Sequence, residues 1–429
     1  MFTDEQVMIR DMAWSFAQER LAPTAAAREK SRTIGPEIIA ELGELGFLGM
    51  TVDPIWGGVG ADSVSYALAL MEIAGGDAAV ATMVSVQNAP VGAILSRFGT
   101  DEQKERWLRT LAEGREIGSF ALTEAQAGSD AANLKTRRAV RSNEGYVIDG
   151  TKQFISSAEI GRTTILFAIT DPAAGKKGIS CFVVANDTPG FAVVGVEEKM
   201  GQRASDTCAL AFEGMKVPFE DRIGEEGQGY AIALSALEAG RIGIAAQATG
   251  IARAAYDRAL AYAHERTAFG STIFELQAVQ FRLAEMATQL EAAQQMVLSA
   301  ARMKDRGQPC LREACMAKLF CSEATERITS AAVQVLGGYG YLADYEIERM
   351  YRDQKVCQIY EGTSDIQKIV IARQLSGGRG HGHMAFNGCQ AEVHKETIFA
   401  KQKKRKTQND WRDIVGASRC NMLSQLHAF

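Results

Sequence analysis

Histidine is scarce in this chain, and its distribution excludes several kinds of catalytic site. Only five of the 429 residues are His, and His264 is the only one before residue 380. A His-based metal centre or a Ser-His-Asp triad is therefore excluded for the main body of the protein. Proline is also rare, with eight residues against 41 Gly, so we expect many turns and close backbone approaches without proline-rich linkers.

Paired cysteines are lacking as well. The eight cysteines are scattered, and the nearest group, Cys310, Cys315 and Cys321, lies in a stretch with helical periodicity. We therefore expect small buried thiols in a reducing cytoplasm, and neither disulfides nor a zinc site.

A strong charge of either sign and a long apolar segment are also lacking. The net charge of −5 favours neither nucleic acid nor an anionic membrane as a partner. No apolar run reaches the roughly 18 residues of a transmembrane helix. The first six residues are acidic and lack the charged-then-apolar pattern of a signal peptide. We expect a cytoplasmic protein that binds neither membrane nor nucleic acid.

Residues 1–118 show helical patterns and predict an N-terminal helical domain. Thr3 and Gln6 fit a capping box, followed by apolar residues at helical spacing. The segment Val64–Phe98 is Ala-rich and nearly free of polar residues on most faces, so we expect it to be buried on several sides.

Residues 119–225 change to short apolar runs separated by turn residues. Runs of this length and spacing are typical of a β-sandwich or barrel, so we expect a middle β domain. The expected strands are Ser119–Leu122, Tyr146–Ile148, Thr164–Phe167, Cys181–Val184 and Phe191–Val194.

Helical periodicity returns and dominates residues 226–376. Three long segments carry it, and the lengths and faces of the last two suit a helix bundle; they are Tyr230–Ala268, Glu275–Arg306 and Arg312–Leu336. The complete order predicts an α+β multidomain protein in which helical, β and helical domains share one cleft.

Residues 377–429 differ in composition from the rest of the chain. They begin with the glycine- and histidine-containing stretch Gly377–His383 and include a basic run, Lys401–Lys406. This composition predicts a disordered, solvated tail. A nucleic-acid or targeting role for the basic run is the alternative.

Glu361 stands alone as an acid between an apolar-aromatic run and a glycine, just before a predicted helix. Ser364 and Gln367 fit a capping box for that helix. With Tyr360 and Gly362 as neighbours, the carboxylate should lose solvation, which raises its pKa toward the range of a general base. An ordinary N-terminal acid favoured by the helix dipole is the alternative.

Two segments of the β domain could form a ligand wall. Leu122–Asp130 follows a strand and carries hydroxyls at Thr123 and Ser129, which can donate to a planar polar ligand. A tight turn explains the same residues equally well. Lys152–Ala158 is a second strand-like piece, in which Phe154 could line a cofactor or simply belong to the core.

Three polar positions in the helical region allow both a structural and a functional interpretation. Arg266, at the end of a long helix, could bind a phosphate or satisfy the last helix carbonyls. The glycines after Gln334 could cap a helix or admit a ligand. Glu238 and Arg241, one turn apart, could form an ion pair or line a channel.

Together these residues resemble an FAD-dependent acyl-CoA dehydrogenase, from about residue 3 to residue 375. The markers occur in the family's order; they are Thr123-Glu124…Gly128-Ser129-Asp130, Arg266…Phe269-Gly270…Gln277, Gln334…Gly337-Gly338 and Tyr360-Glu361-Gly362-Thr363. The resemblance implies an N-terminal helical domain, a middle β domain and a C-terminal four-helix bundle. It also implies FAD as the cofactor and assembly as a homotetramer.

The resemblance further implies which residues bind the cofactor and the substrate. Those expected beside the flavin ring are Phe120, Leu122, Thr123, Ser129, Phe154, Ile155 and Ser156. Those expected at the diphosphate and adenine end, partly across a subunit boundary, are Arg266, Phe269, Gln277, Gln334, Gly337 and Gly338. Those that would complete the cofactor site are Thr363 and Asp365. Those expected to contact the acyl-CoA are Ser129, Glu238, Arg241 and Gly362.

The implied reaction is α,β-dehydrogenation of an acyl-CoA. Glu361 would take the α-proton while the β-hydrogen leaves as hydride to flavin N5, giving a trans-2-enoyl-CoA. The backbone N–H of Glu361 and a flavin ribityl hydroxyl would hydrogen-bond the thioester carbonyl. The expected electron acceptor is an electron-transferring flavoprotein.

Substrate class and alternatives follow from the same resemblance. Val84–Ala89 is similar to short- and branched-chain members, and its lack of Arg weighs against a glutaryl-type substrate. The same fold could instead act as an acyl-CoA oxidase or desulfinase, or persist as a non-catalytic flavoprotein scaffold. Phe154 stands where many relatives carry Trp, Ala125 replaces a common Pro, and the chain after Leu375 matches nothing typical of the family.

Overall fold

The computed structural model describes residues 2–136, 140–141 and 143–376. The chain divides into two compact units, Met1–Ala372 and Arg373–Phe429, and the described residues of the second unit are 373–376. The tail expected from residue 377 onward therefore lies outside the described residues.

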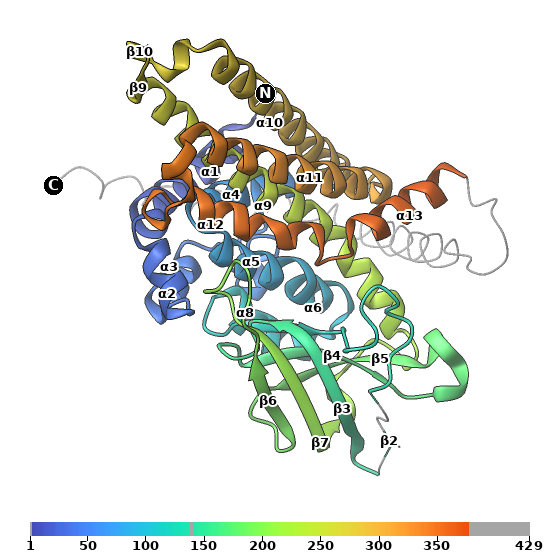
Figure 1. The fold of residues 1–429 in the computed structure, drawn as a ribbon. Helices are drawn as coiled ribbons and strands as arrows, with labels where there is room; N and C mark the ends of the chain where they lie inside the picture. The colour runs from blue at the N-terminus through green and yellow to red at the C-terminus, as the bar shows by residue number, and fades with distance from the viewer. Residues whose placement is uncertain (1, 137–139, 142, 377–429) are drawn as a thin grey trace, which may run out of the picture. The chain divides into compact units, whose positions relative to one another are not determined.

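Helices form the first part of the chain, as the sequence predicted (Figure 1). They are α1 (Asp4–Phe16), α2 (Ala25–Ser31), α3 (Pro36–Glu44), α4 (Ser63–Gly76), α5 (Ala78–Val86), α6 (Ala93–Phe98), α7 (Asp101–Gln103) and α8 (Arg109–Ala112). The capping box at α1 is confirmed. The backbone N–H of Gln6 donates to Thr3 Oγ1 over 3.2 Å, and the backbone N–H of Thr3 donates to Gln6 Oε1 over 3.1 Å.

One helical stretch corrects the expectation about membrane-length segments. Ala78–Phe98 is long and apolar enough to cross a membrane by length and composition alone. In the folded protein, 89% of its apolar window is buried inside. The physical reason is that α5 lies in the core against α4 and the later helix α9 (Gly229–Glu265), so its apolar residues face other helices.

The middle region forms two four-stranded sheets, and four of the five predicted strands fall within observed ones; the fifth, Ser119–Leu122, runs one residue past the end of β1. The first sheet has the order β1 (Gly118–Ala121), β4 (Thr163–Ile169), β5 (Ile179–Ala185) and β8 (Arg222–Ile223). The second has the order β2 (Val140–Arg141), β3 (Gly145–Ser156), β7 (Thr207–Pro218) and β6 (Phe191–Val196). Only β1 and β4 pair in parallel; the other neighbours are antiparallel.

The first sheet is buried on both faces. One face meets the second sheet in a core that contains an edge-on contact between Tyr146 and Phe182, whose ring centroids are 5.0 Å apart. The other face packs through Ile165 and Phe167 against helical residues such as Ile232 on α9. This layering confirms the sandwich and brings the end of β1 to the helices.

Long helices form the rest of the described chain, as predicted. They are α9 (Gly229–Glu265), α10 (Gln277–Asp305), α11 (Leu311–Leu336), α12 (Ile347–Gln354) and α13 (Ser364–Leu375), with a small hairpin of β9 (Thr267–Ala268) and β10 (Ser271–Thr272) between the first two. Helix α4 shares one continuous core with α9, α10 and α11. Gly250 permits this approach, because a Cβ there would lie 2.1 Å from the carbonyl oxygen of Met71.

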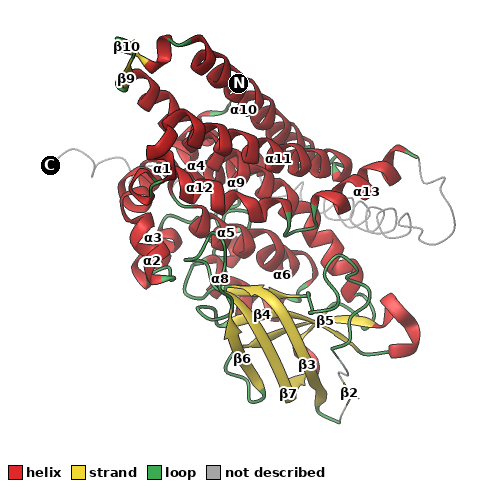
Figure 2. Ribbon diagram, viewed as in Figure 1, coloured by secondary structure: helices red, strands yellow, loops and turns green. Residues whose placement is uncertain are grey.

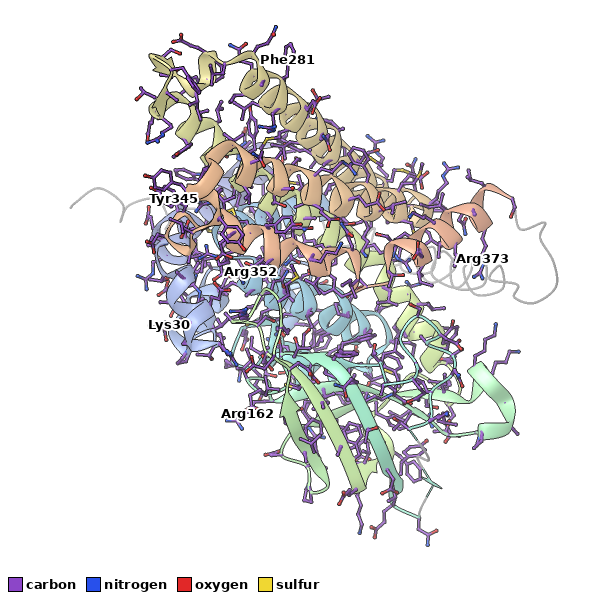
Figure 3. The ribbon with its side chains drawn as sticks, in the orientation of Figure 1. Lys30, Arg162, Phe281, Tyr345, Arg352 and Arg373 are labelled. Atoms are coloured by element: carbon purple, nitrogen blue, oxygen red, sulfur yellow. The ribbon has the colours of Figure 1, made fainter. Side chains whose placement is uncertain are left out.

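The figures show how these layers are arranged within the first unit. The helices form one layer and both sheets lie on one side of it (Figure 2). Phe281 stands outward on α10, and Tyr345 lies just before α12 (Figure 3). Both side chains are exposed, at 61% and 37% respectively.

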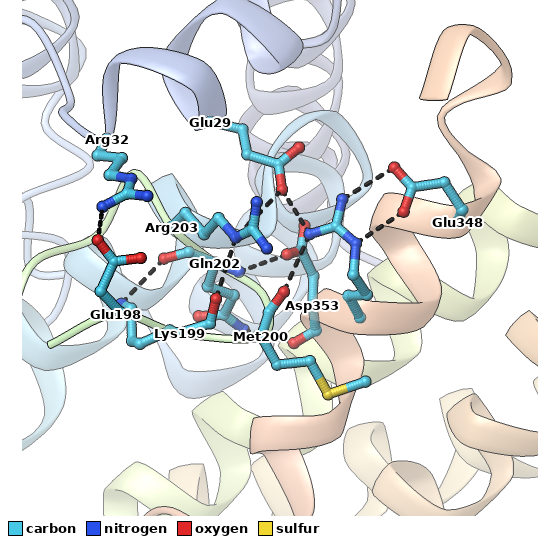
Figure 4. A network of polar contacts seen from close by, with 10 residues as sticks. Glu29, Arg32, Glu198, Lys199, Met200, Gln202, Arg203, Glu348 and Asp353 are labelled. Carbon is cyan, nitrogen blue, oxygen red and sulfur yellow. Dashed lines mark hydrogen bonds and ion pairs between the residues drawn. The ribbon is translucent and has the colours of Figure 1, made fainter. Parts of the chain in front are cut away.

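A polar network ties the segment before β7 to helices on both sides (Figure 4). Arg352 on α12 donates to both oxygens of Glu348, to the carbonyl of Met200 over 3.0 Å, and to Glu29 on α2. The backbone N–H of Gln202 donates to Asp353, which follows Arg352. Segment 197–206 is thereby held against α2 and α12.

Candidate functional site

Glu361 lies in a tight turn that two side chains hold from outside. Both Glu361 (φ 55°) and Gly362 (φ 89°) are in the left-handed region, which is unusual for Glu. Lys318 Nζ donates to the Gly362 carbonyl over 2.6 Å, and Gln367 Nε2 donates to the same oxygen over 2.8 Å. The direction of the Glu361 side chain is therefore fixed by its backbone.

The predicted capping box at α13 is wrong. Ser364 is the first residue of the helix, and its hydroxyl is buried without a partner. Thr363 Oγ1 accepts from the backbone N–H of Ile366 over 3.3 Å, so Thr363 takes the capping position. Gln367 turns back to the Glu361–Gly362 turn and supports the site instead of the helix end.

The carboxylate of Glu361 lies against α9 at Gly240. A Cβ at Gly240 would be 2.3 Å from Glu361 Oε2, so only glycine leaves room for this position. Glu361 Oε2 is buried and has no hydrogen-bond partner. Burial raises the pKa of Glu361 to about 7, although the positive charges of Arg241 and Lys318 oppose the shift. A group with this pKa can accept a proton near neutral pH.

Arg241 occupies a buried position near Glu361. The residue is 5% exposed, and its Nε has no hydrogen-bond partner. No ion pair joins it to Glu238 among the described residues; Glu238 Oε1 instead accepts from the Cys310 thiol over 3.6 Å. The simple ion-pair interpretation is therefore not supported, and the Arg241 guanidinium keeps a donor free for a ligand.

Tyr360, which precedes Glu361, belongs to a buried hydrogen-bond chain. Tyr360 donates to Gln247 over 2.8 Å, Gln247 donates to Thr82 over 2.7 Å, and Thr82 donates to Gln202. Gln202 in turn donates to Asp353, whose pKa burial raises to about 7. These hydrogen bonds connect the Glu361–Gly362 turn to α9, α5, segment 197–206 and α12.

The two predicted wall segments of the β domain lie side by side. The backbone N–H of Gln153 donates to the carbonyl of Thr123 over 2.9 Å. At the bulge in β3, Phe154 has φ 60° and is 60% exposed, while Ile155 is buried. Phe154 is therefore not a core residue, and its ring is available to a planar ligand.

A buried ion pair supports this wall and was not anticipated from the sequence. Lys152 Nζ donates to Glu124 Oε1 over 2.9 Å and to the Leu122 carbonyl over 3.0 Å. Glu124 also accepts from the backbone N–H groups of Lys135 and Thr136. The pair anchors the loop that follows β1, and Ser129 is exposed on that loop.

A second group of predicted residues gathers at another part of the bundle. Arg266, Gly337 and Gly338 line a cavity of about 360 Å³ together with the ring of Tyr339, over which Arg266 lies at 5.5 Å. Phe269, on the β9–β10 hairpin, is 94% exposed. Gln277 and Gln334 are also exposed but do not line this cavity.

The predicted cofactor residues therefore form two groups. One group, which includes Phe120, Thr123 and Ser156, lies in the β domain, and Thr363 and Asp365 follow the base at the start of α13. The other group lies near the β9–β10 hairpin, which Figure 1 places far from the β domain. A single chain does not bring the two groups together.

Four residues have supporting roles that the sequence did not predict: Lys318, Gly240, Gln367 and Lys152. Lys318 follows Ala314 by one turn and precedes Cys321 and Thr325 on the buried face of α11. A lysine on an otherwise apolar helical stripe is the signal that could have identified it. Gly240 carried no such signal, because an Ala- and Gly-rich helix gives no reason to select one glycine.

The side chains of the two groups can be compared with what FAD requires of a binding site. An exposed Phe154 and the hydroxyls of Thr123 and Ser156 suit a planar ring with polar edges. Gly338 has open space where a Cβ would stand, and Arg266 beside it supplies permanent charge for a diphosphate. These residues fit the cofactor. Among the described residues, no group of three His, Cys, Asp or Glu could hold a metal ion.

The chain is similar to known proteins along most of its length. Three family domains match in order: acyl-CoA dehydrogenase N-terminal domain at residues 3–115, middle domain at 119–215 and C-terminal domain at 227–376. The chain is 42% identical over 374 residues to a rat (Rattus norvegicus) short/branched chain specific acyl-CoA dehydrogenase, covering 87% of this chain and 86% of the relative.

Solved structures are similar as well. The structure of butyryl-CoA dehydrogenase from Megasphaera elsdenii is 40% identical with a TM-score of 0.86, covering 88% of this chain and 99% of that chain. A chain in a structure reported for the electron transferring flavoprotein of Acidaminococcus fermentans is 42% identical with a TM-score of 0.86, covering 87% of this chain and 98% of that chain.

Proposed function

The chain belongs to the acyl-CoA dehydrogenase family, and from this premise we propose that Glu361 is the general base of its reaction. The protein is an FAD-dependent oxidoreductase that dehydrogenates short- or branched-chain acyl-CoA between the α and β carbons. The single observation that carries the proposal is the buried, unpartnered Oε2 of Glu361, together with a pKa of the carboxylate that is raised to about 7.

Glu361 removes the α-proton of the thioester. Its carboxylate is held by the turn and by the space at Gly240, so it needs little rearrangement to reach a substrate carbon in that space. Among the described residues, the backbone N–H of Glu361 donates to no acceptor. This N–H is therefore available to the thioester carbonyl, where a donor stabilises the charge that develops during proton removal.

When bound, FAD would supply the acceptor for the β-hydrogen, which would leave as hydride. We assign the ring end of the cofactor to Phe120, Leu122, Thr123, Phe154, Ile155 and Ser156, with Ser129 on the neighbouring loop. Thr363 and Asp365 complete that end. We assign the diphosphate and adenine end to Arg266, Phe269, Gln277, Gln334, Gly337 and Gly338.

The substrate contacts proposed are Ser129, Glu238, Arg241 and Gly362. We further propose that the acyl pocket is short. Tyr66 donates to Ser85 Oγ over 3.4 Å, and a Cβ at Gly243 would lie 2.8 Å from the Tyr66 hydroxyl. Gly243 follows Gly240 on α9, and the charge of Glu361 contributes to raising the pKa of Tyr66, after the larger effect of burial. These groups put a polar wall near the base, which favours short acyl chains.

We propose a homotetramer with an electron-transferring flavoprotein as acceptor. Two separated groups of cofactor residues, together with an almost fully exposed Phe269, are expected when a second copy completes each site. The structural relative reported with an electron transferring flavoprotein supports the acceptor. The proposed domains are 1–118, 119–225 and 226–376. A cytoplasmic location fits the six described cysteines, which are free thiols and buried.

The proposal is tested by anaerobic titration with butyryl-CoA and isobutyryl-CoA, followed by flavin absorbance. We expect bleaching of the yellow band in the native protein. Glu361→Gln should retain FAD and should not bleach. A yellow protein that neither thioester bleaches would contradict the proposed substrate class, and rapid bleaching of Glu361→Gln would contradict the proposed base.

A further inference from the structure

Lys318 is a fully buried lysine that the mechanism above does not use. It lies on α11 with 0% of its surface exposed. Its Nζ donates to the Gly362 carbonyl over 2.6 Å and forms no ion pair among the described residues. An ammonium group buried without an adjacent carboxylate destabilises a fold. Such a group is retained where its charge is used.

Several titratable and charged groups face Lys318. Arg241 lies on α9, Cys315 on α11 and Cys357 in the short helix Lys355–Gln358. Glu361 is the one carboxylate among the groups that act on its pKa. Burial lowers the pKa of Lys318 to about 8, and the charges of Cys357 and Glu361 oppose this shift.

Lys318 is likewise among the groups that act on the pKa of Glu361. Arg241 and Lys318 are the two cations that lower its pKa, and Tyr66 on α4 is a neutral neighbour. The Arg241 guanidinium still has a free donor, so it is available to a ligand. The Lys318 ammonium instead faces the protein's own backbone.

The hydrogen bond from Lys318 to the Gly362 carbonyl also restrains the backbone of the turn. Glu361 is held in a left-handed conformation, which is strained for a residue other than glycine and persists only where neighbours enforce it. Lys318 and Gln367 both donate to the Gly362 carbonyl and so fix the peptide that follows the base. Gln367 is tethered to α13, whereas Lys318 links the turn to the rigid bundle helix α11.

We propose that Lys318 is a positioning residue of the dehydrogenation reaction, which holds the base turn through the Gly362 carbonyl and provides a fixed counter charge to the Glu361 carboxylate. The inference rests on the proposed role of Glu361. Lys318 acts through the base and not on the substrate. It therefore has two separable effects, one on geometry and one on charge.

Two variants of nearly equal length separate these effects. Lys318→Met removes both the charge and the donor, whereas Lys318→Gln removes the charge and keeps an amide donor for the Gly362 carbonyl. Lys368→Met is the matched control, because it removes one positive charge from the side of α13 where the lysine side chain is 57% exposed. Solvent screens that charge from the site.

The first readout is the pH dependence of kcat/KM in the holoenzyme. We expect the acid midpoint to move upward by about one pH unit in both Lys318 variants, which lowers the rate at pH 6 about tenfold. The plateau above the new midpoint should fall only in Lys318→Met. Lys368→Met should leave the midpoint and the plateau unchanged. Equal kcat/KM plateaus in Lys318→Met and Lys318→Gln would overturn the proposal that Lys318 holds the turn. An unchanged midpoint in both variants would overturn the proposal that its charge acts on Glu361.

The second readout does not depend on turnover. Infrared titration of the holoenzyme without substrate, with the matching spectrum of Glu361→Gln subtracted, reports the ionisation of Glu361. The midpoint should rise in Lys318→Met and in Lys318→Gln. A purely structural lysine would lower thermal stability and leave this midpoint in place, and that result overturns the inference. If Lys318→Met does not accumulate as folded protein, Lys318→Gln carries the same test.

Failure of the inference and failure of the proposed function are distinguishable. A native protein that acyl-CoA does not bleach, with an infrared midpoint that still moves in Lys318→Gln, would overturn the proposed function and support the charge coupling. A native protein that bleaches, with a midpoint that does not move, would support the proposed function and overturn the role of Lys318.

Discussion

Two buried lysines, one in the β domain and one in the helix bundle, have different hydrogen-bond partners. Lys152 on β3 donates to the Glu124 carboxylate over 2.9 Å and to the Leu122 carbonyl. Lys318 on α11 donates to a backbone carbonyl and has no carboxylate partner among the described residues. Burial lowers the pKa of both to about 8.

The difference is one of partner, since a carboxylate neutralises Lys152 and none contacts Lys318 among the described residues. Lys152 and Glu124 satisfy one another, so this pair fixes a loop of the β domain and leaves no reactive group. Lys318 and Glu361 lie near one another without contact, so the carboxylate keeps an unpartnered oxygen. This incompletely paired buried charge is the observation on which the proposed role of Glu361 rests.

The largest expected effect is the loss of turnover when Glu361 is replaced. Glu361→Gln removes the proton acceptor and preserves the shape of the side chain. We expect turnover of a short acyl-CoA to fall at least about a thousandfold while FAD stays bound. Steady-state rates and the flavin spectrum of the purified variant measure both quantities. A reduction of less than about tenfold would place the base elsewhere.

The next effect compares the two lysines through stability. Lys152→Met leaves Glu124 buried without its counter charge, and we expect a loss of about 3 kcal/mol in the free energy of unfolding. Lys318→Met breaks no ion pair, so its loss should stay within about 1 kcal/mol. Urea unfolding at one pH measures both. Similar losses would show that the two lysines have the same structural role.

A smaller effect is expected from the space that the base occupies. Gly240→Ala places a Cβ 2.3 Å from Glu361 Oε2 and should displace the carboxylate, lowering kcat about ten- to a hundredfold. Gly243→Ala is the matched control on the same helix, since its Cβ would meet the hydroxyls of Tyr66 and Ser85 at 2.8 and 2.9 Å. This change should alter chain-length preference more than kcat for butyryl-CoA. The reverse pattern would contradict the assignment of the two glycines.

The smallest expected effect is a pH-dependent gain in stability. The pKa of Glu361 is about 7 in the folded protein, above its unfolded value, so the native state loses stability as the pH rises from about 4.5 through 7. Glu361→Gln lacks this loss. We therefore expect its free energy of unfolding at pH 8 to exceed that of the native protein by roughly 1–2 kcal/mol, with little difference at pH 4.5. Calorimetry at the two pH values measures the difference.

The architecture could be predicted from the sequence because it depends on local patterns, whereas Glu361 was selected as the base through the family resemblance, and that role stays a prediction. The five predicted strands are short apolar runs between turn residues, and Glu361 stands out as an isolated acid before a helix. Strand β7 was not predicted, although it pairs with both β3 and β6. Its buried side carries Cys208, Leu210 and Phe212, but Ala209 and Ala211 between them are also apolar, so the period-2 signal is weak.

The supporting residues of the site could not be derived from local patterns. Gln367 was predicted to close a capping box, but it donates to the base turn because Thr363 already caps the helix. Lys318 and Gly240 lie 43 and 121 residues before Glu361 in the sequence. Their roles depend on which faces of α9 and α11 meet the turn, and only the packed structure supplies that information.

The pH dependence of kcat/KM for butyryl-CoA in the native holoenzyme tests the central claim most directly. If Glu361 is a base buried among apolar groups and two cations, the rate should fall tenfold per pH unit below a midpoint near 7. A midpoint near that of an ordinary exposed glutamate, about 4.5, or a rate independent of pH across this range, would contradict it.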